Sequence, residues 1–327
     1  MKVCFLHIGS EKTGTSSIQR YFGKNRSAFL ECGYWYPDCL TGGPAVHRRL
    51  SDEALLNPID PKGQLAVEFR EEYRQAAAGG AHTAVISSEF FHSRYRRPKQ
   101  LNHIKHFLHE YFDKVCVIYY CRRQDHLMTS MHSRAIRGGW ASDDPGSVYE
   151  QKGHYYFDNF AICNLWSKVF RKENLVCRVF DRSKLHNGDV IDDITSIIGA
   201  PTDGVRRDVN ESLSFICLNA LLLFNRSGHK TDRTTRRRLV LTDERQQGAR
   251  QPFMTKQDAR NFLARFDESN AQFFATYIDP SMGTGFPGGF ESFPDTITRP
   301  SSEDVRAFLH AADLDETVVG DILAEQA

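Results

Sequence analysis

The sequence predicts an α/β fold, in which a parallel sheet is flanked by helices and followed by a helical C-terminal extension. Four short runs, at residues 2–8, 83–87, 114–121 and 175–180, are rich in Val, Ile, Tyr, Phe and Cys. They are apolar on both faces, as parallel strands are when helices cover both sides of the sheet. Helix-like patterns lie between these runs, and this alternation indicates right-handed crossovers.

Apolar spacing predicts helices over residues 16–29, 100–112 and 156–171, and another that begins near Asp125. Residues 34–64 interrupt the alternation with several Pro and Gly, so we expect a substrate insertion that walls an active site. After about residue 205 the pattern is helical, at 212–225, 255–277 and 301–314, with a Gly/Pro-rich loop at 279–300. We expect a core over 1–205 and an extension over 206–327 packed on it as a single domain.

The composition is that of a globular protein. The 327 residues are 40% apolar and 25% charged, which excludes disordered and fibrous classes. The 42 Lys and Arg nearly balance the 41 Asp and Glu, for a net charge of +1. This balance argues against a general nucleic-acid binder, or a protein held on anionic membranes by its charge alone. Any anion site must therefore be local.

The eight cysteines show no CxxC spacing, so neither a zinc knuckle nor a redox pair is expected. Cys4, Cys116 and Cys177 fall inside the predicted strands, which favours free thiols and a reducing compartment. The N-terminal apolar run is too short for a signal peptide, and the longest apolar stretch, 218–224, is too short to span a bilayer. We expect a soluble, cytoplasmic protein without a metal.

The first predicted strand leads into a glycine-containing turn that opens a helix. In such a turn, main-chain N–H groups and the helix dipole converge on one point and form an anion site. Gly9 and Gly14 have the spacing of a Walker A loop, so the sheet is P-loop-like, but Thr15 stands where that motif has its lysine. The lysine is instead inside the loop, at Lys12, where it can reach one terminal anionic group without a metal. The alternative is an ordinary helix cap.

A second motif follows the strand at 114–121. Arg122 stands at the end of this strand, and Ser130 follows eight residues later, about two helical turns on. At the carboxyl edge of an open sheet this pair can clamp a second anion near the first. The alternative for Arg122 is a surface salt bridge.

Together the two motifs resemble the sulfotransferase family, whose donor is 3′-phosphoadenosine 5′-phosphosulfate. Its 5′-phosphosulfate loop is matched by Lys12, Thr13, Gly14, Thr15 and Ser16, and its 3′-phosphate site by Arg122 and Ser130. Further segments look like bacterial members: 87–89, Trp166 with Phe170 before 173–175, and 210–214. The G-x-x-G-x-x-K segment of the cytosolic small-molecule enzymes and the membrane anchor of the Golgi enzymes are missing. A bacterial carbohydrate- or metabolite-type enzyme therefore fits better.

The resemblance implies transfer of a sulfuryl group to a hydroxyl or amine of a small-molecule or carbohydrate acceptor. Lys12 would stabilise the leaving group, Thr13 to Ser16 would cradle the 5′-phosphate, and Arg122 with Ser130 would hold the 3′-phosphate. Two residues compete as the base: Glu89, which follows the second strand, and His47, in the insertion. A third alternative is that neither of them is the base. The alternative for Glu89 is a structural hydrogen-bond acceptor for the first loop, and that for His47 is a solvent-facing loop residue. A P-loop kinase and a nucleotide-binding protein without turnover are the alternative functions.

Residues 226–250 contain a basic cluster of eight cations against three acids, a local net charge of +5. We expect either a solvated, mobile loop or a surface that faces an anionic acceptor or the donor phosphates. The aromatic residues Tyr34, Trp35 and Tyr36 can stack on an acceptor ring or pack under the insertion, and packing is slightly favoured.

Overall fold

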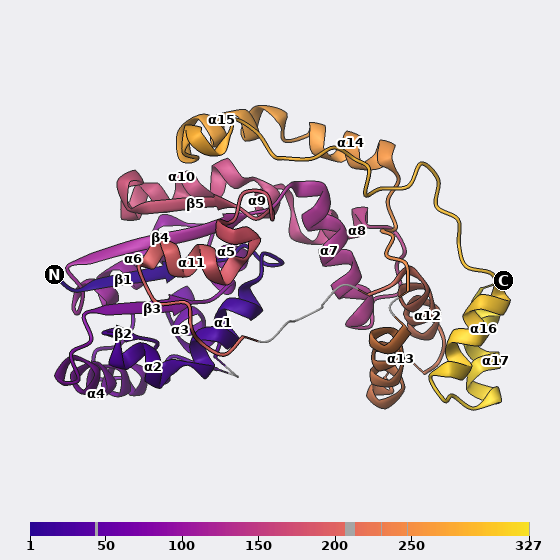
Figure 1. Ribbon diagram of the computed structural model, residues 1–327, viewed down its shortest axis with the longest axis horizontal. Coiled ribbons are helices and arrows are strands. Elements are labelled where there is room, and N and C mark those ends of the chain that lie inside the picture. The colour runs from indigo at the N-terminus through magenta and orange to yellow at the C-terminus, as the bar shows by residue number, and fades with distance from the viewer. Residues whose placement is uncertain (43–44, 207–212, 230, 247, 327) are drawn as a thin grey trace. The chain divides into compact units, whose positions relative to one another are not determined.

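The computed structural model describes residues 1–42, 45–206, 213–229, 231–246 and 248–326 (Figure 1). The chain forms two compact units. The first comprises residues 1–122, 155–209 and 267–287, and the second comprises residues 123–154, 210–266 and 288–327. Each unit is described by itself below. Of the predicted helical extension, the segment at 267–287 belongs to the first unit. That the remainder of 206–327 packs on the sheet stays a prediction.

The first unit contains one five-stranded sheet in which every paired strand is parallel, in the order β2-β3-β1-β4-β5. The strands are β1 (Val3–His7), β2 (Tyr34–Trp35), β3 (Thr83–Ser87), β4 (Lys114–Cys121) and β5 (Leu175–Val179). The predicted α/β class with a parallel sheet is confirmed, as are the four predicted strands. The edge strand β2 was not predicted, because two residues are too few for a periodic signal.

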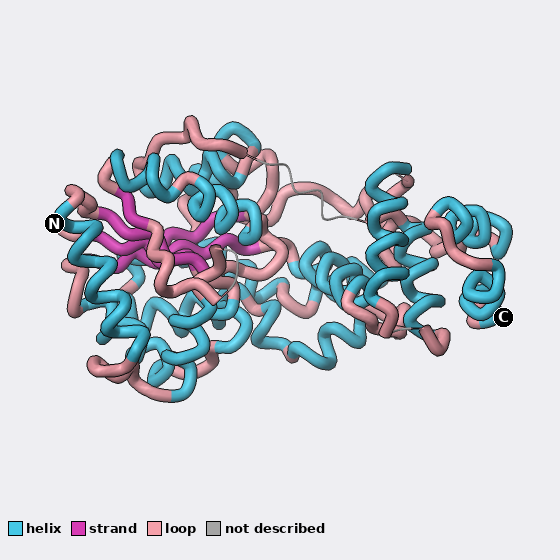
Figure 2. Tube along the Cα trace, turned by 90° about the horizontal axis from the view of Figure 1, so that it is seen from below, coloured by secondary structure: helices cyan, strands magenta, loops and turns pink. Residues whose placement is uncertain are grey.

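Helices cover both faces of the sheet, as Figure 2 shows. One face packs on α1 (Thr15–Lys24), α2 (Arg26–Glu31) and α11 (Val190–Ile198) through a core that includes Phe22, Ile118 and Ile194. The other face packs on α3 (Arg48–Leu56), α4 (Gln64–Ala78), α5 (Phe90–Arg94), α6 (Pro98–His109), α10 (Asn159–Phe170) and α15 (Asp267–Tyr277). Short 3₁₀ turns occupy Lys172–Asn174, His186–Gly188 and Pro280–Met282. Burial on both faces explains why the strands are apolar throughout.

Several predicted helices are divided. The helix expected over 16–29 is α1 and α2, separated at Asn25, whose side chain donates to the Tyr21 carbonyl at 2.8 Å. The helix expected over 156–171 is divided into α9 (His154–Phe157) and α10. The insertion at 34–64 contains β2 and α3, and Trp35 and Tyr36 in it are buried, so these two aromatic residues pack in the core.

The second unit is helical. Its helices are α7 (Gln124–Arg137), α8 (Gly146–Lys152), α12 (Phe215–Arg226), α13 (Arg233–Gln246), α14 (Lys256–Ala264), α16 (Ser302–Ala311) and α17 (Glu316–Ala324). Its core includes Leu221, Leu239, Phe308 and Ile322. The expectation of a loop across the basic cluster is wrong, because most of the cluster forms α13, whose apolar residues Leu239 and Val240 are buried.

All eight cysteines are free thiols, and Cys4, Cys116 and Cys177 are buried in their strands. Within the described part of the chain, no helix is long and apolar enough to cross a membrane. Residues 210–212 of the segment at 210–214 lie outside the described residues.

Candidate functional site

At the carboxyl ends of the neighbouring strands β1 and β3, the chain leaves the sheet toward opposite faces. The loop after β1 leads to α1 on one face, whereas the chain after β3 leads to α5 and α6 on the other. In open α/β sheets ligands bind at such a point. The two connections are close: a Cβ atom on Gly9 would lie 3.3 Å from the Cα atom of Glu89. We call residues 9–16 the first loop.

The first loop is fixed by hydrogen bonds to β4 and within itself. The N–H of Ser10 donates to the Tyr120 carbonyl, and the N–H of Tyr120 donates to the Gly9 carbonyl, both at 2.8 Å. The Thr13 hydroxyl donates to the Ser10 carbonyl at 2.7 Å, so it holds the loop in shape. Lys12 (φ 63°) and Gly14 (φ 74°) are both left-handed. Main-chain hydrogen bonds and the short Thr13 side chain therefore fix the conformation of the loop.

The loop ends at a helix N-terminus that suits an anion. Within the described chain no side chain caps α1, and no acidic residue lies in its first turn. The N–H groups and the dipole at this end of α1 are thus available to negative charge. Gly14 is required at this turn, since a Cβ atom on it would lie 2.9 Å from Cγ1 of Val190.

The structure brings Lys12 and Arg122 together, although they are 110 residues apart. The Arg122 guanidinium donates to the Lys12 carbonyl at 2.9 Å and lies 5.9 Å from the Phe180 ring centroid. Both side chains are half-buried, and the hydrogen bond joins the first loop to the residue that follows β4. Ser130 lies on α7 in the second unit, and its predicted pairing with Arg122 stays a prediction.

Glu89 begins α5 beside the first loop and is half-buried. Its Oε2 atom accepts a hydrogen bond of 2.7 Å from Nε2 of Gln19, which is a buried residue of α1. No partner of the other carboxylate oxygen occurs among the described residues. This oxygen can therefore accept a proton or a hydrogen bond from a ligand.

His47 is fully buried, in contrast to the usual solvent-facing loop histidine. Its Nε2–H group donates to the Pro37 carbonyl at 2.7 Å, and Nδ1 accepts the N–H of Ser87 at 2.8 Å. Burial lowers the pKa of His47 to about 3, so the ring is neutral at physiological pH. Since both nitrogens bind the main chain, His47 joins the insertion to the end of β3.

Two polar residues near the loop were not singled out from the sequence. His7, the last residue of β1, is fully buried; its Nδ1 lies 2.8 Å from the Ser87 hydroxyl, and burial lowers its pKa to about 3. Glu11, inside the first loop, is buried and accepts a hydrogen bond from the Tyr156 hydroxyl. A histidine in an apolar strand and an acid in a loop predicted to bind an anion are the signals that could have found them.

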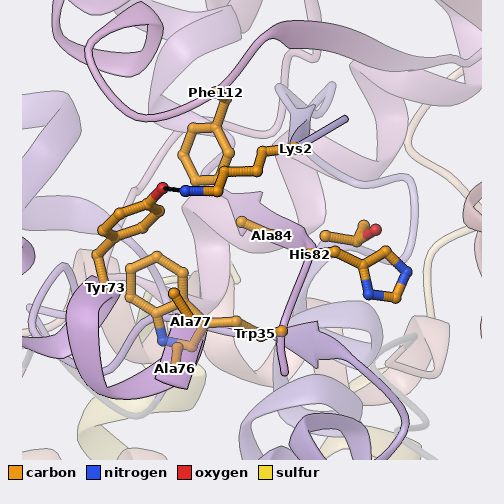
Figure 3. Close-up of a pocket in the computed structure, with 10 residues that line it drawn as sticks. Lys2, Trp35, Tyr73, Ala76, Ala77, His82, Ala84 and Phe112 are labelled. Atoms are coloured by element: carbon orange, nitrogen blue, oxygen red, sulfur yellow. Dashed lines mark hydrogen bonds between the residues drawn. The ribbon is translucent and has the colours of Figure 1, made fainter. Parts of the chain in front are cut away.

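A small hollow lies at the other end of the strands, near the starts of β1 and β3 (Figure 3). It is lined mostly by apolar side chains, and the Lys2 ammonium points at the Tyr73 hydroxyl across it. The first loop is not part of this hollow. Across the described residues, no group of three or more His, Cys, Asp or Glu could hold a metal ion.

The fold and the first loop define an α/β protein in which a glycine-containing loop and a helix N-terminus follow the central strand. Among solved structures, the chain is similar to a sulfotransferase from Alicyclobacillus acidocaldarius, with a TM-score of 0.39 and 14% identity, covering 68% of this chain and 91% of that one. Among curated proteins, it is 25% identical over 171 residues to an uncharacterized protein of Archaeoglobus fulgidus. That match covers 50% of this chain and 45% of the relative, so the chain spans less than half of its length. No family model matches the chain.

Proposed function

We propose that the protein is a sulfotransferase that moves a sulfuryl group from 3′-phosphoadenosine 5′-phosphosulfate to a hydroxyl or amine acceptor, which can be a carbohydrate. The observation that carries this proposal is the first loop: it contains Lys12, its glycine-shaped turn ends at the uncapped α1, and Arg122 is hydrogen-bonded to it. One lysine within the turn, without the Walker lysine at position 15, suits one terminal anionic group.

The residues present fit such a donor. The N–H groups from Thr13 to Ser16 and the dipole of α1 would hold its 5′-phosphate, and Arg122 with Ser130 would hold its 3′-phosphate. The one acid of the loop, Glu11, is bound by Tyr156 and so is kept in a fixed place. The donor supplies the sulfuryl group when it is bound.

The chain's own groups supply the proton and charge chemistry. As the acceptor oxygen or nitrogen forms its bond to sulfur, the bond from sulfur to the phosphate oxygen breaks, and the Lys12 ammonium stabilises the charge on that oxygen. The acceptor proton passes to the free oxygen of Glu89, while Gln19 holds the other oxygen in place. We assign the base to Glu89 rather than His47, because both nitrogens of His47 are engaged with the main chain.

Calorimetric binding of 3′,5′-phosphoadenosine and of ATP tests the proposal. The wild type should prefer 3′,5′-phosphoadenosine, and Lys12→Ala, Lys12→Met and Arg122→Ala should each weaken its binding about 10- to 100-fold, as expected for a lost charged hydrogen bond. Lys24→Ala is the matched control: Lys24 is an exposed cation in the last turn of the same helix and should leave binding unchanged.

Three outcomes would contradict the proposal. Preference for ATP, or strictly Mg²⁺-dependent ATP turnover, would assign the site to a kinase. An equal loss of nucleotide affinity in Lys24→Ala and Lys12→Met would show that binding depends only on the net charge of the protein. Tight binding of 3′,5′-phosphoadenosine without transfer to any of a broad panel of acceptors would leave a nucleotide-binding protein without turnover.

A further inference from the structure

Helix α13 presents an unusual distribution of charge. Its inward side consists of Thr235, Leu239, Val240 and Thr242, which are buried, and Leu239 and Val240 join the core of the second unit. The Cys217 thiol on α12 lies 3.7 Å from the Leu239 carbonyl. Asp243 is also turned inward, where its carboxylate accepts the N–H of Ser214 at 3.0 Å. The helix is therefore anchored on one side.

The outward side of α13 is rich in arginine. We call its four exposed arginines, Arg233, Arg237, Arg238 and Arg245, the basic face. At 100° per residue they fall within an arc of about 140°, and at 1.5 Å per residue they span about 18 Å along the axis. Glu244 is the exposed acid on this arc. The cations are thus spread over a broad surface and do not converge on one point.

Most arginines of the basic face have no acidic partner in the described part of the chain. Among the described residues, Arg233, Arg237 and Arg245 form no ion pair, and Arg238 donates to a main-chain carbonyl, that of Asp313, at 3.0 Å. By contrast, Arg226 on α12 pairs with Asp143 at 3.2 Å. Unpaired cations on one side of a helix attract an external anionic surface, and this attraction is hidden in the whole-chain charge of +1.

An apolar side chain stands in the middle of the basic face. Leu241 lies at about 80° on the helical arc, between Arg237 and Arg245. Its side chain is 38% exposed, so it adds an apolar group to the basic face. A leucine at this place gains from contact with an apolar layer beneath an anionic surface, and gains little from a soluble polyanion.

We propose that the basic face docks α13 on the surface of an anionic lipid bilayer, with the arginines at the lipid phosphates and Leu241 in contact with the apolar layer beneath them. A cluster of at least four cations on an amphipathic helix is suited to anionic lipids. The breadth of the arc matches a flat surface better than a single strand of polymer. This docking is independent of the proposed transfer reaction.

Sedimentation of the full chain with lipid vesicles tests the docking. It should bind vesicles in which about a third of the lipid is phosphatidylglycerol and not vesicles of phosphatidylcholine alone. The triple variant Arg233→Gln, Arg237→Gln and Arg245→Gln should bind about 100-fold more weakly, since each cation near the surface contributes about five-fold. A matched triple of exposed lysines in the first unit, Lys62→Gln, Lys99→Gln and Lys172→Gln, loses the same formal charge and should keep binding.

A fourth variant distinguishes a bilayer from a soluble polyanion. Leu241→Ser should weaken vesicle binding about three-fold or more and leave heparin binding unchanged. If the protein does not bind the anionic vesicles, or if both triple variants lose binding equally, the proposal is wrong. If heparin binds as tightly as the vesicles and Leu241→Ser changes neither, the face belongs to a soluble polyanion instead.

Discussion

The first loop and the basic face are both proposed to bind an anion, but they are built in opposite ways. The first loop is held by main-chain hydrogen bonds to β4, and both Lys12 within it and Arg122, which bonds to it, are half-buried. The basic face consists of long side chains in solvent on a helix that is anchored from behind. A site of the first kind depends on single groups, whereas a surface of the second kind depends on a sum of nearly equal contributions. Each prediction below tests this difference.

Acid should destabilise the region around the first loop by the largest amount. His7 and His47 have pKa values near 3 in the folded chain, against about 6.5 when unfolded. The unfolded chain therefore binds more protons between pH 3 and pH 6.5, and stability is lost as pH falls through this window. At pH 5 the loss is roughly 2 kcal/mol for each histidine. Urea unfolding at pH 7.5 and pH 5 measures it.

The control for the acid prediction is His7→Gln, which removes one of the two groups. The difference in unfolding free energy between the two pH values should shrink by about half in this variant. If the difference in unfolding free energy is unchanged in this variant, His7 does not contribute to the loss of stability in acid. Because arginine stays charged throughout this range, vesicle binding by the basic face should be the same at both pH values.

Removing the proposed base should have the next largest effect. Glu89→Gln should lower the rate of sulfuryl transfer about 100-fold or more, roughly 3 kcal/mol, and leave binding of 3′,5′-phosphoadenosine nearly unchanged. The reason is that Glu89 acts on the acceptor proton and not on the nucleotide. The comparison variant is Gln19→Leu, which frees the second carboxylate oxygen but keeps the carboxylate and should reduce transfer less. Normal turnover in Glu89→Gln would exclude it as the base.

The sequence predicts the strands of the sheet well, because their apolar pattern is local. It predicts the candidate site poorly where a side chain depends on partners from distant parts of the chain. The limits of Thr83–Ser87 and Lys114–Cys121 could be read directly, because buried strands are continuous apolar runs. The environment of His47 could not be predicted, since Pro37 lies ten residues earlier in the insertion and Ser87 lies on β3, and these partners meet His47 only in the fold.

Helix α13 illustrates the other way in which a local signal fails. Its many arginines indicate a solvated segment, and only Leu239 and Val240 show a buried side. The exposed Leu241 beside them blurs the helical period, so the pattern does not separate a helix from a loop. The contacts of α13 with α12 decide the structure, and they are not visible in the sequence of α13 itself.

A single methyl group in the first loop should cost about 2 kcal/mol of stability. Gly14→Ala combines a left-handed backbone (φ 74°) with a Cβ atom 2.9 Å from Val190. Gly80→Ala is the matched control, because Gly80 also has a positive φ of 91° but nothing lies within 4 Å of the added atom. Thermal unfolding should show a smaller loss for Gly80→Ala, of about 1 kcal/mol. Equal losses would mean that contact with Val190 does not matter.

The smallest effect should come from single substitutions on the basic face. Arg237→Gln should weaken vesicle binding only about five-fold and leave stability within about 0.5 kcal/mol. Raising the salt from about 0.05 M to about 0.5 M should weaken vesicle binding by a larger factor than nucleotide binding, because exposed charges are screened more strongly. The opposite order would show that the basic face is not an exposed electrostatic surface.

The hydrogen bond from Arg122 to the Lys12 carbonyl gives the first loop one more property. If the two groups hold the phosphates as proposed, this hydrogen bond links the two sites, and we expect occupation of either one to change the affinity of the other by the same factor. Arg122→Ala releases a main-chain carbonyl of the loop in addition to removing a cation. A nucleotide that carries only the 5′-phosphosulfate should therefore also bind more weakly to this variant, even though it has no 3′-phosphate for Arg122 to hold.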